Sequence, residues 1–415
     1  VKRKFAFRRI LMTAKSQVVM ACRSARQWGA GMPGGAEGIV HATRLVEKIY
    51  AAGNLRRPLA RIDIDENNCF GRKEWGAIRK AVADQAPALA PAVLWKHTVH
   101  SSIEQEGVAP FTKDRGAEQG DPFGPVEAAL TIAADVRSAR EALHAMQAAG
   151  DLGWATNGMQ GTASAKDAYD DWRHKARTYE SKTPLERARG EDPSTRTHPA
   201  NEVVKQGGIV DLWFLDDGTF YTLPELALPM LQAYDAAVKA SGGSRNFEKT
   251  KVTFYASEAE KTRNAAAWGI QELQELSHII TPEQDNKTLG IASGSSQAAV
   301  QQLHEKTELI RALHDALQMV EHEGTELTLA KACLGVAKVN HLLRAAGTEL
   351  HEEKEALRAF DAVQRATLDR LFPGLTEESH MQATLGLQVG GLSLRKAEQV
   401  ALPAALASMI MAEPK

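Results

Sequence analysis

The chain has 415 residues, of which 43% are hydrophobic and 25% are charged. These fractions are those of an ordinary globular protein with a substantial core, and the length predicts two or three subdomains. The three cysteines are scattered and have no CxxC spacing, which excludes a cysteine-based zinc site and favours an intracellular location, nuclear or cytoplasmic. No apolar stretch reaches the roughly 20 residues that a membrane span needs, so we expect no membrane association.

The charge is balanced overall but uneven along the chain. A formal net charge of -2 does not by itself indicate a nucleic-acid-binding protein. No Asp or Glu precedes Glu37, however, and the first stretch is rich in Lys and Arg. Such a block can neutralise phosphates and release their counterions, whereas a solvated tail is the alternative interpretation.

The first half of the chain is predicted to be mostly helical. Residues 1–58 have helical patterning with a glycine-rich turn in the middle. The alternating apolar run 59–65 predicts a strand, and a helix follows over the region of Trp75 and Val82. Residues 121–149 begin with Asp-Pro, which suits the start of a helix, and continue as an alanine-rich helix. The polar residues 155–208 predict an inserted loop or a flexible flap.

A hairpin is predicted next, because residues 209–214 and 219–222 flank an Asp-Gly turn signal. A helix over 223–240 and short strands over 251–255 and 289–291 follow in the prediction, and helical patterning continues from Ser296 to the end. Strands and helices that do not alternate strictly indicate the α+β class, with a sheet followed by a helical bundle.

Acidic residues occur at two places where they are costly. Asp63 and Asp65 alternate with isoleucines on the predicted strand 59–65, so both lie on one face, and Asp is depleted in strands. Asp216 and Asp217 are adjacent at the tip of the apolar hairpin, where like charges raise each other's pKa unless a cation neutralises them. If the two strands pair, the carboxylates can hold two divalent ions, and oxygen-only ligands favour Mg²⁺ or Mn²⁺. Two ordinary polar turns are the alternative.

Three short motifs follow one another along the chain. Residues 65–70 read Asp-Glu-Asn-Asn-Cys-Phe, residues 119–125 read Gln-Gly-Asp-Pro-Phe-Gly-Pro, and residues 214–217 read Phe-Leu-Asp-Asp. In this order they resemble the palm motifs of reverse transcriptases, specifically the non-LTR (LINE-like) retrotransposon branch. The first matches D-x-x-N-A-F with Cys69 in place of the usual Ala, and the third is similar to the F/Y-x-D-D box. The second matches Q-G-D-P-x-x-P and is the most specific string in the chain.

The resemblance implies an RNA-directed DNA polymerase that transfers a nucleotide from a dNTP to the 3′-OH of a DNA primer on an RNA template. It implies that Asp65, Asp216 and Asp217 bind Mg²⁺ or Mn²⁺, with Asp217 as a tuning or weaker ligand. Phe70 is then a steric gate that excludes the 2′-OH of a ribonucleotide. Finally, Gln119 and Gly120 are expected to pack against the incoming nucleotide and the template base.

Weaker matches suggest further site residues. Residues 246–251 resemble the fourth motif, in which Lys249 would donate a proton to the leaving pyrophosphate or contact the triphosphate, with Lys251 as its rival. Leu289-Gly290 resembles the primer grip, and Gly390–Arg395 resembles an element found after the thumb. The basic pair Arg8 and Arg9 is expected to contact the triphosphate or the template.

The resemblance also predicts a right-hand polymerase architecture. Residues 1–58 would be partial fingers, residues 59–292 a palm with an antiparallel sheet and the polar insertion, and residues 293–415 a helical thumb and C-terminal extension. Two alternatives stay open. One is an RNA-templated RNA polymerase, which Phe70 disfavours. The other is a decayed or domesticated retroelement protein that binds nucleic acid without catalysis, which the long insertion and the near-neutral charge favour.

Overall fold

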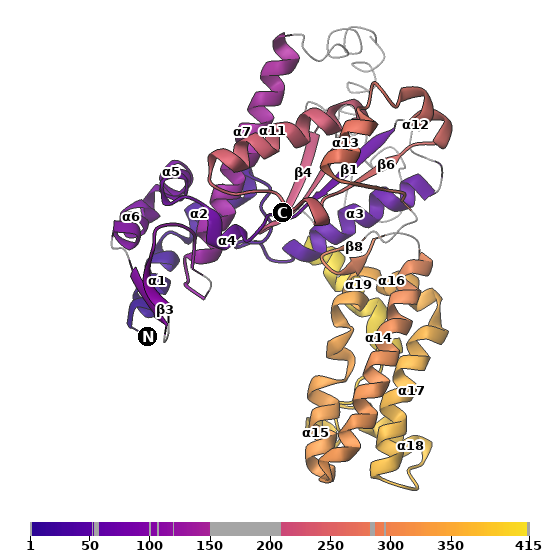
Figure 1. The fold of residues 1–415 in the computed structure, drawn as a ribbon. Coiled ribbons are helices and arrows are strands. Elements are labelled where there is room, and N and C mark those ends of the chain that lie inside the picture. The colour runs from indigo at the N-terminus through magenta and orange to yellow at the C-terminus, as the bar shows by residue number, and fades with distance from the viewer. Residues whose placement is uncertain are drawn as a thin grey trace, which may run out of the picture. The chain divides into compact units, whose positions relative to one another are not determined.

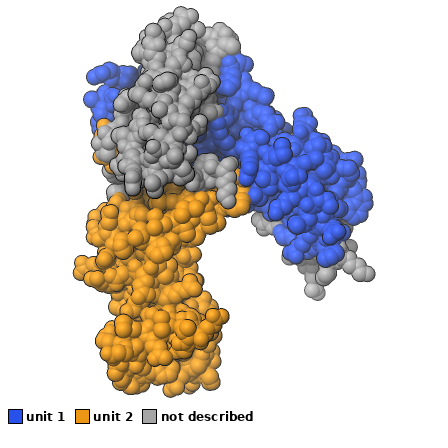
Figure 2. Space-filling model, turned by 180° about the vertical axis from the view of Figure 1, so that it is seen from behind, with its two compact units in different colours: residues 1–31, 55–281 blue, residues 32–54, 282–415 orange. Residues whose placement is uncertain are grey.

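A computed structural model describes residues 2–51, 53, 58–98, 101–105, 108–118, 120–149, 209–282, 287–293 and 296–412. The chain forms two compact units, and each is assembled from two separate stretches of sequence (Figure 2). Unit 1 contains residues 1–31 and 55–281, and unit 2 contains residues 32–54 and 282–415. The segment predicted as partial fingers, 1–58, is thus divided between the units, and the predicted insertion 155–208 lies outside the described residues.

Unit 1 is built on a five-stranded sheet with the strand order β4-β5-β1-β6-β7 (Figure 1). Its strands are β1 (Leu59–Ile64), β4 (Ile209–Phe214), β5 (Asp217–Thr222), β6 (Lys251–Tyr255) and β7 (His278–Ile280). Three of the four strand pairs are antiparallel, but β6 and β7 are parallel. The predicted purely antiparallel sheet is therefore wrong, because the helices α12 (Glu258–Asn264) and α13 (Ile270–Leu276) supply the crossover that a parallel pair needs.

The predicted hairpin is confirmed, but its turn lies earlier than the Asp-Gly signal indicated. Phe214 pairs with Asp217, so the two-residue turn is Leu215-Asp216 and Gly218 already belongs to β5. Gly218 has a different reason to be glycine. A Cβ there would lie 2.3 Å from the ring of Trp213, which packs across the hairpin.

Helices cover this sheet and extend the core of unit 1. The long helices α7 (Gly124–Ala149) and α11 (Ala227–Ala240) pack against each other. Tyr234 of α11 stacks on Trp213 of β4 with ring centroids 5.6 Å apart. A second core cluster joins the other end of α7 to the first helices, where the rings of Phe7 and Phe123 stack 4.5 Å apart. The remaining elements of unit 1 are α1 (Lys2–Thr13), α2 (Lys15–Ser24), α4 (Cys69–Arg72), α5 (Trp75–Gln85), α6 (Ala90–Thr98), β2 (Ser101–Gln105) and β3 (Val108–Lys113).

Unit 2 is mainly helical, as its sequence predicted, and its core is apolar. Helix α3, which the sequence suggested as part of the fingers, packs against α16 and α19. The predicted strand 289–291 is instead a short hairpin, in which Leu289 and Gly290 form the turn at φ values of 50° and 76°. Among the described residues, no helix of either unit is long and apolar enough to cross a membrane. The elements of unit 2 are α3 (Gly35–Ala51), β8 (Lys287–Thr288), β9 (Ile291–Ala292), α14 (Ser296–Leu317), α15 (Glu323–Cys333), α16 (Asn340–Glu352), α17 (Lys354–Leu371), α18 (Glu377–Thr384) and α19 (Ala397–Ala412).

Candidate active site

Strand pairing in unit 1 brings the three predicted carboxylates to one end of the sheet. Ile64, the last residue of β1, pairs with Gly218 of β5. Asp65 directly follows this last paired residue, and its charge raises the pKa of both Asp216 and Asp217, so the three carboxylates lie close together. Asp216 occupies the turn directly before Asp217. Residues 151 positions apart in the chain are thus brought side by side.

Burial and mutual repulsion act on these carboxylates together. Burial raises the pKa of Asp216, and the charge of Asp65 raises it further. The pKa of Asp217 is raised to about 6 by burial, then by Asp216 and by Asp65. Carboxylates crowded in this way favour a cation as their neighbour.

One such cation comes from the segment that the sequence suggested. Lys249 directs its Nζ to within 3.2 Å of Oδ1 of Asp65. Asn246 donates from its side chain to Oδ2 of Asp65 at 3.2 Å, and its backbone N–H donates to the carbonyl of Asp65 at 2.8 Å. Lys251, the rival lysine, pairs with Asp63 in the register of β6 against β1. The structure therefore brings Lys249, rather than Lys251, to the Asp65 carboxylate.

Asp63 differs from Asp65 although both were predicted on one face. Its Oδ1 accepts hydrogen bonds from Nε of Arg61 at 2.9 Å and from the hydroxyl of Thr219 at 2.8 Å. Asp63 is therefore neutralised within the sheet, whereas Asp65 lies beyond the last strand residue and its carboxylate accepts hydrogen bonds from Asn246 and Lys249.

The side chains that could bind a metal ion at this end of the sheet are carboxylates. In the described part of the chain, no three His, Cys, Asp or Glu side chains are already arranged to hold a metal ion. Asp65 follows β1, Asp216 and Asp217 lie at the turn between β4 and β5, and all three provide only carboxylate oxygens. Burial raises the pKa of Asp216 and of Asp217, and the neighbouring carboxylates raise both further. Oxygen-only ligands in general favour Mg²⁺ or Mn²⁺ over zinc. The ammonium of Lys249 lies where it offsets part of this negative charge.

The loop after Asp65 is shaped by a left-handed residue. Asn68 has φ = 46°, a conformation that Asn tolerates better than other side chains. It precedes the short helix α4, which carries Phe70 in a half-buried position. Gly116, at φ = 80°, approaches so closely that a Cβ there would lie 2.6 Å from the carbonyl oxygen of Phe70. The backbone of Phe70 is thus packed closely against that of Gly116.

A buried ionic network beneath this loop was not predicted from the sequence. Lys73 is 1% exposed and lies 2.7 Å from Oε2 of Glu66 and 2.7 Å from Oδ2 of Asp135. The hydroxyl of Tyr234 donates to Glu66 at 2.7 Å, and that of Ser241 donates to Asp135 at 2.9 Å. Burial alone would lower the pKa of Lys73, but its two carboxylate partners raise it. The sequence contained a weak signal, since Asp135 lies directly after Ala133 and Ala134 in the alanine-rich helix α7.

The Gln-Gly-Asp-Pro string lies at the start of α7, and only part of it is described. Gln119 lies outside the described residues. Gly120 is exposed at φ = 79°, and a Cβ there would lie 3.9 Å from Nζ of Lys4. Asp121 is buried, and its Oδ1 accepts a hydrogen bond from the backbone N–H of Phe123 at 2.8 Å. The aspartate therefore stabilises the start of the helix, while the glycine faces outward.

Arg8 and Arg9 are exposed on α1. Among the residues that the structure describes, neither arginine forms a hydrogen bond or ion pair with Asp65, Asp216 or Asp217. Lys4, one turn earlier, is the basic residue that the structure brings beside Gly120. No pattern distinguished it from the other basic residues of this stretch.

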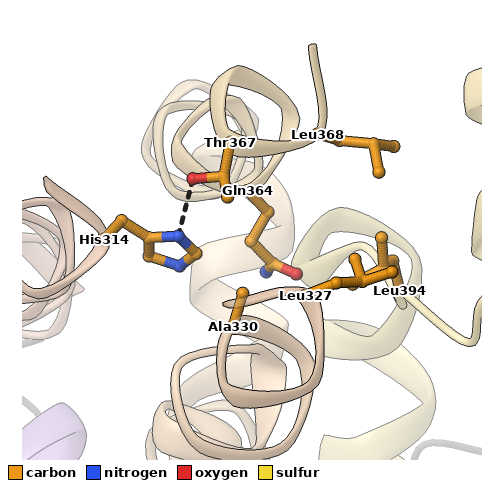
Figure 3. Close-up of a pocket in the computed structure, with 7 residues that line it drawn as sticks. All are labelled: His314, Leu327, Ala330, Gln364, Thr367, Leu368 and Leu394. Carbon is orange, nitrogen blue, oxygen red and sulfur yellow. Dashed lines mark hydrogen bonds between the residues drawn. The ribbon is translucent and has the colours of Figure 1, made fainter. Parts of the chain in front are cut away.

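Unit 2 contains two pockets that involve none of the predicted site residues. One is lined by His314, Gln364, Thr367 and four apolar side chains, and Nδ1 of His314 lies 2.8 Å from the hydroxyl of Thr367 (Figure 3). The other extends from Asp361 to Lys396 and includes Arg365 and His380. The carboxylate site of unit 1 is instead a group of side chains at a sheet end.

Neither a model of a known protein family nor a curated protein sequence matches this chain. Among solved structures, apo telomerase from Candida tropicalis, truncated from its C-terminal domain, has a TM-score of 0.34 at 11% identity. Telomerase from Candida albicans in complex with the TWJ fragment of telomeric RNA has a TM-score of 0.40 at 9% identity. The matches cover 60% and 90% of this chain, and 41% and 56% of the respective telomerase chains.

Proposed function

We propose that the chain is the polymerase core of a reverse transcriptase, an RNA-directed DNA polymerase of the non-LTR retrotransposon type. The observation that carries the proposal is the meeting of Asp65, Asp216 and Asp217 at one end of the sheet, with Lys249 against Asp65. The order and content of the sequence motifs add the template and substrate. The partners would be an RNA template, a DNA primer and a dNTP.

The proposed reaction is nucleotidyl transfer. The primer 3′-OH loses its proton to solvent and its oxygen forms a bond to the α-phosphorus. The bond between the α-phosphorus and its bridging oxygen breaks, and pyrophosphate leaves with the electron pair. Asp65, Asp216 and Asp217 would hold Mg²⁺ or Mn²⁺, which when bound lowers the pKa of the attacking hydroxyl and offsets the charge of the leaving group. Lys249 would contact the triphosphate or give a proton to the departing pyrophosphate. Catalysis would come from positioning and electrostatics.

The test is primer extension on an RNA template with dNTPs and Mg²⁺, comparing the wild-type protein with Asp65→Ala and Asp216→Ala. Each variant should lower extension by more than about 100-fold, which is the usual scale for removing one electrostatic group from an active site. Asp84→Ala is the matched control, because Asp84 is an exposed residue of unit 1 paired only with Lys80. Extension by either active-site variant at the wild-type rate would contradict the proposal. Template binding without extension by the wild type would support the non-catalytic alternative.

The choice of DNA over RNA synthesis depends on Phe70. Phe70→Ala should relax the discrimination between dNTP and rNTP by at least about tenfold, because a small side chain leaves room for the 2′-OH. The measurement is the ratio of kcat/KM for the two nucleotides on one template. An unchanged ratio would remove the reason for assigning DNA synthesis.

A further inference from the structure

The turn that carries Asp216 has an unusual backbone. Leu215 is the first central residue of the two-residue turn between Phe214 and Asp217, and its φ is 55°. Turns of this kind normally have glycine at that position, because an L-side chain is crowded at positive φ. A leucine persists in such a conformation only when its surroundings determine it. The residue directly before a proposed metal ligand is therefore held by something outside the turn.

Gln27 provides that support from a distant part of the sequence. Its side chain is buried, with the residue 1% exposed. Its Oε1 accepts a hydrogen bond from the backbone N–H of Leu215 at 2.7 Å, and its Nε2 donates to the carbonyl of Leu215 at 3.0 Å. Both backbone groups of the crowded residue are thus bound by one side chain.

The segment around Gln27 is itself fixed against β4. The backbone N–H of Trp28 donates to the carbonyl of Trp213 at 2.6 Å, and the N–H of Trp213 donates to the carbonyl of Arg26 at 3.2 Å. The N–H of Gly29 donates to Oε1 of Gln27 at 3.1 Å, which orients the amide. Gly29 also permits the close approach, because a Cβ there would lie 2.5 Å from the nitrogen of Leu215.

We propose that Gln27 is a positioning residue, which keeps Leu215 in its left-handed conformation and thereby fixes Asp216 for nucleotidyl transfer. This inference rests on the proposed function, in which Asp216 binds the catalytic metal. The chemistry of the contact selects glutamine. A glutamate could not donate to the carbonyl of Leu215, a methionine could do neither, and an asparagine is one methylene shorter.

The experiment is a double-mutant cycle between Gln27→Met and Leu215→Gly. Glycine adopts positive φ without crowding, so it removes the strain that Gln27 is proposed to hold. Gln27→Met should lower kcat about 100-fold, the scale of a small misplacement in an active site, with KM for dNTP nearly unchanged. In the Leu215→Gly background, the same Gln27→Met change should lower kcat by less than about threefold.

Gln85→Met is the matched control for general destabilisation. Gln85 is a half-buried glutamine of unit 1 that likewise bonds backbone, since its Nε2 donates to the carbonyls of Ala81 and Leu130 at 3.1 and 2.7 Å. A merely structural role for Gln27 predicts that both Met variants lose melting temperature and activity in proportion. The proposal would be overturned if the effects of Gln27→Met and Leu215→Gly on kcat were fully additive. It would also be overturned if Gln85→Met lowered kcat as much as Gln27→Met does.

A second measurement separates this inference from the proposed function. Amide hydrogen exchange of the peptide that covers residues 213–218 requires no turnover. We expect faster exchange in Gln27→Met than in Gln85→Met. We also expect the double variant Gln27→Met with Leu215→Gly to exchange at nearly the rate of Leu215→Gly alone. If the wild type does not extend primers, the proposed function fails, and exchange alone then decides whether Gln27 holds the turn. Unchanged exchange at residues 213–218 in Gln27→Met would overturn the positioning role.

Discussion

Asp65 and Asp216 lie at the same end of one sheet, but the segments that carry them are held by different kinds of interaction. The loop after Asp65 is anchored by charged groups, since Lys73 lies between Glu66 and Asp135 in a buried network. The turn at Asp216 is anchored by a neutral amide, since Gln27 binds both backbone groups of Leu215. One support depends on charge balance, and the other depends on backbone conformation.

This difference predicts how each support fails. Removing one member of a buried ionic network leaves its partners charged and unpaired, which costs far more than the pair contributes. Removing the neutral amide leaves two backbone groups without partners and a crowded residue without support. We therefore expect substitutions that weaken the support of Asp65 to change mainly the free energy of unfolding and its pH dependence. Substitutions that weaken the support of Asp216 should change mainly kcat.

The largest effect is expected for Lys73→Met. It leaves Glu66 and Asp135 buried without a cation, and the free energy of unfolding should fall by about 3–5 kcal/mol. Urea denaturation with a probe in unit 1 measures this loss. Lys80→Met is the control, because the Lys80–Asp84 pair is exposed and should contribute no more than about 0.5 kcal/mol. A loss below about 1 kcal/mol for Lys73→Met would show that the network does not anchor the loop.

The second effect concerns pH. Burial raises the pKa of Asp135 from 3.8 to about 6. Lys73 acts in the opposite direction, but the charge of Glu66 raises the pKa of Asp135 further. A carboxyl group whose pKa is higher in the folded state makes the protein less stable as pH rises between these values. The rise from 3.8 to about 6 corresponds to about 3 kcal/mol at most. Asp135→Asn, which resembles the protonated form, should therefore match the wild type near pH 4 and exceed it at pH 7.

The measurement is the free energy of unfolding at several pH values between 4 and 7 for both proteins. Gln27→Met is the useful comparison, because it removes no titrating group and should shift the whole curve without changing its shape. An Asp135→Asn variant that is less stable than the wild type at pH 7 would mean that the ion pair with Lys73 outweighs burial.

The third effect concerns the close approach at Gly29. Gly29→Ala would place a Cβ 2.5 Å from the nitrogen of Leu215 and 3.0 Å from the carbonyl carbon of Phe214. Because both atoms belong to backbone, the turn must shift, at a cost of about 1–3 kcal/mol, and primer extension should fall. Gly76→Ala is the control, since nothing lies within 4 Å of its Cβ position in helix α5, and it should stabilise by about 0.5–1 kcal/mol. Full activity of Gly29→Ala would show that the turn tolerates displacement.

Much of the sheet and the meeting of the carboxylates followed from the sequence. Alternation predicted β1, and apolar runs beside turn signals predicted β4, β5 and β6. The antiparallel pairing of β1 with β5 places the end of β1 beside the start of β5, where the acidic residues lie. The turn was displaced by two residues because Gly218 serves the packing of Trp213 and not the turn itself. Local sequence contains no information about which distant ring will lie over a glycine.

The supports of the site could not be predicted for the same reason. Gln27 contacts a residue 188 positions away, and Lys73 contacts one 62 positions away. Neither residue belongs to a motif, and glutamine and lysine are normally exposed. The parallel pairing of β7 and the division of residues 1–58 between two units likewise depend on long-range contacts. Hydrophobic patterns of period 2 and 3.6 indicate which face of a strand or helix is buried, but they do not indicate which other element packs against that face.

The smallest effect compares the two left-handed residues next to the carboxylates. Asn68, at φ = 46°, precedes α4 on the Asp65 side, and Leu215, at φ = 55°, precedes Asp216. Asparagine already tolerates this conformation, so Asn68→Gly should change the free energy of unfolding by no more than about 0.5 kcal/mol. Leu215→Gly relieves crowding of about 1 kcal/mol or more but loses apolar packing. In a background without the Gln27 amide, the gain from Leu215→Gly should therefore become visible, whereas Asn68→Gly should remain neutral in every background. Thermal and urea denaturation of the single and combined variants would test this, and a large effect of Asn68→Gly would mean that strain is shared by both sides of the site.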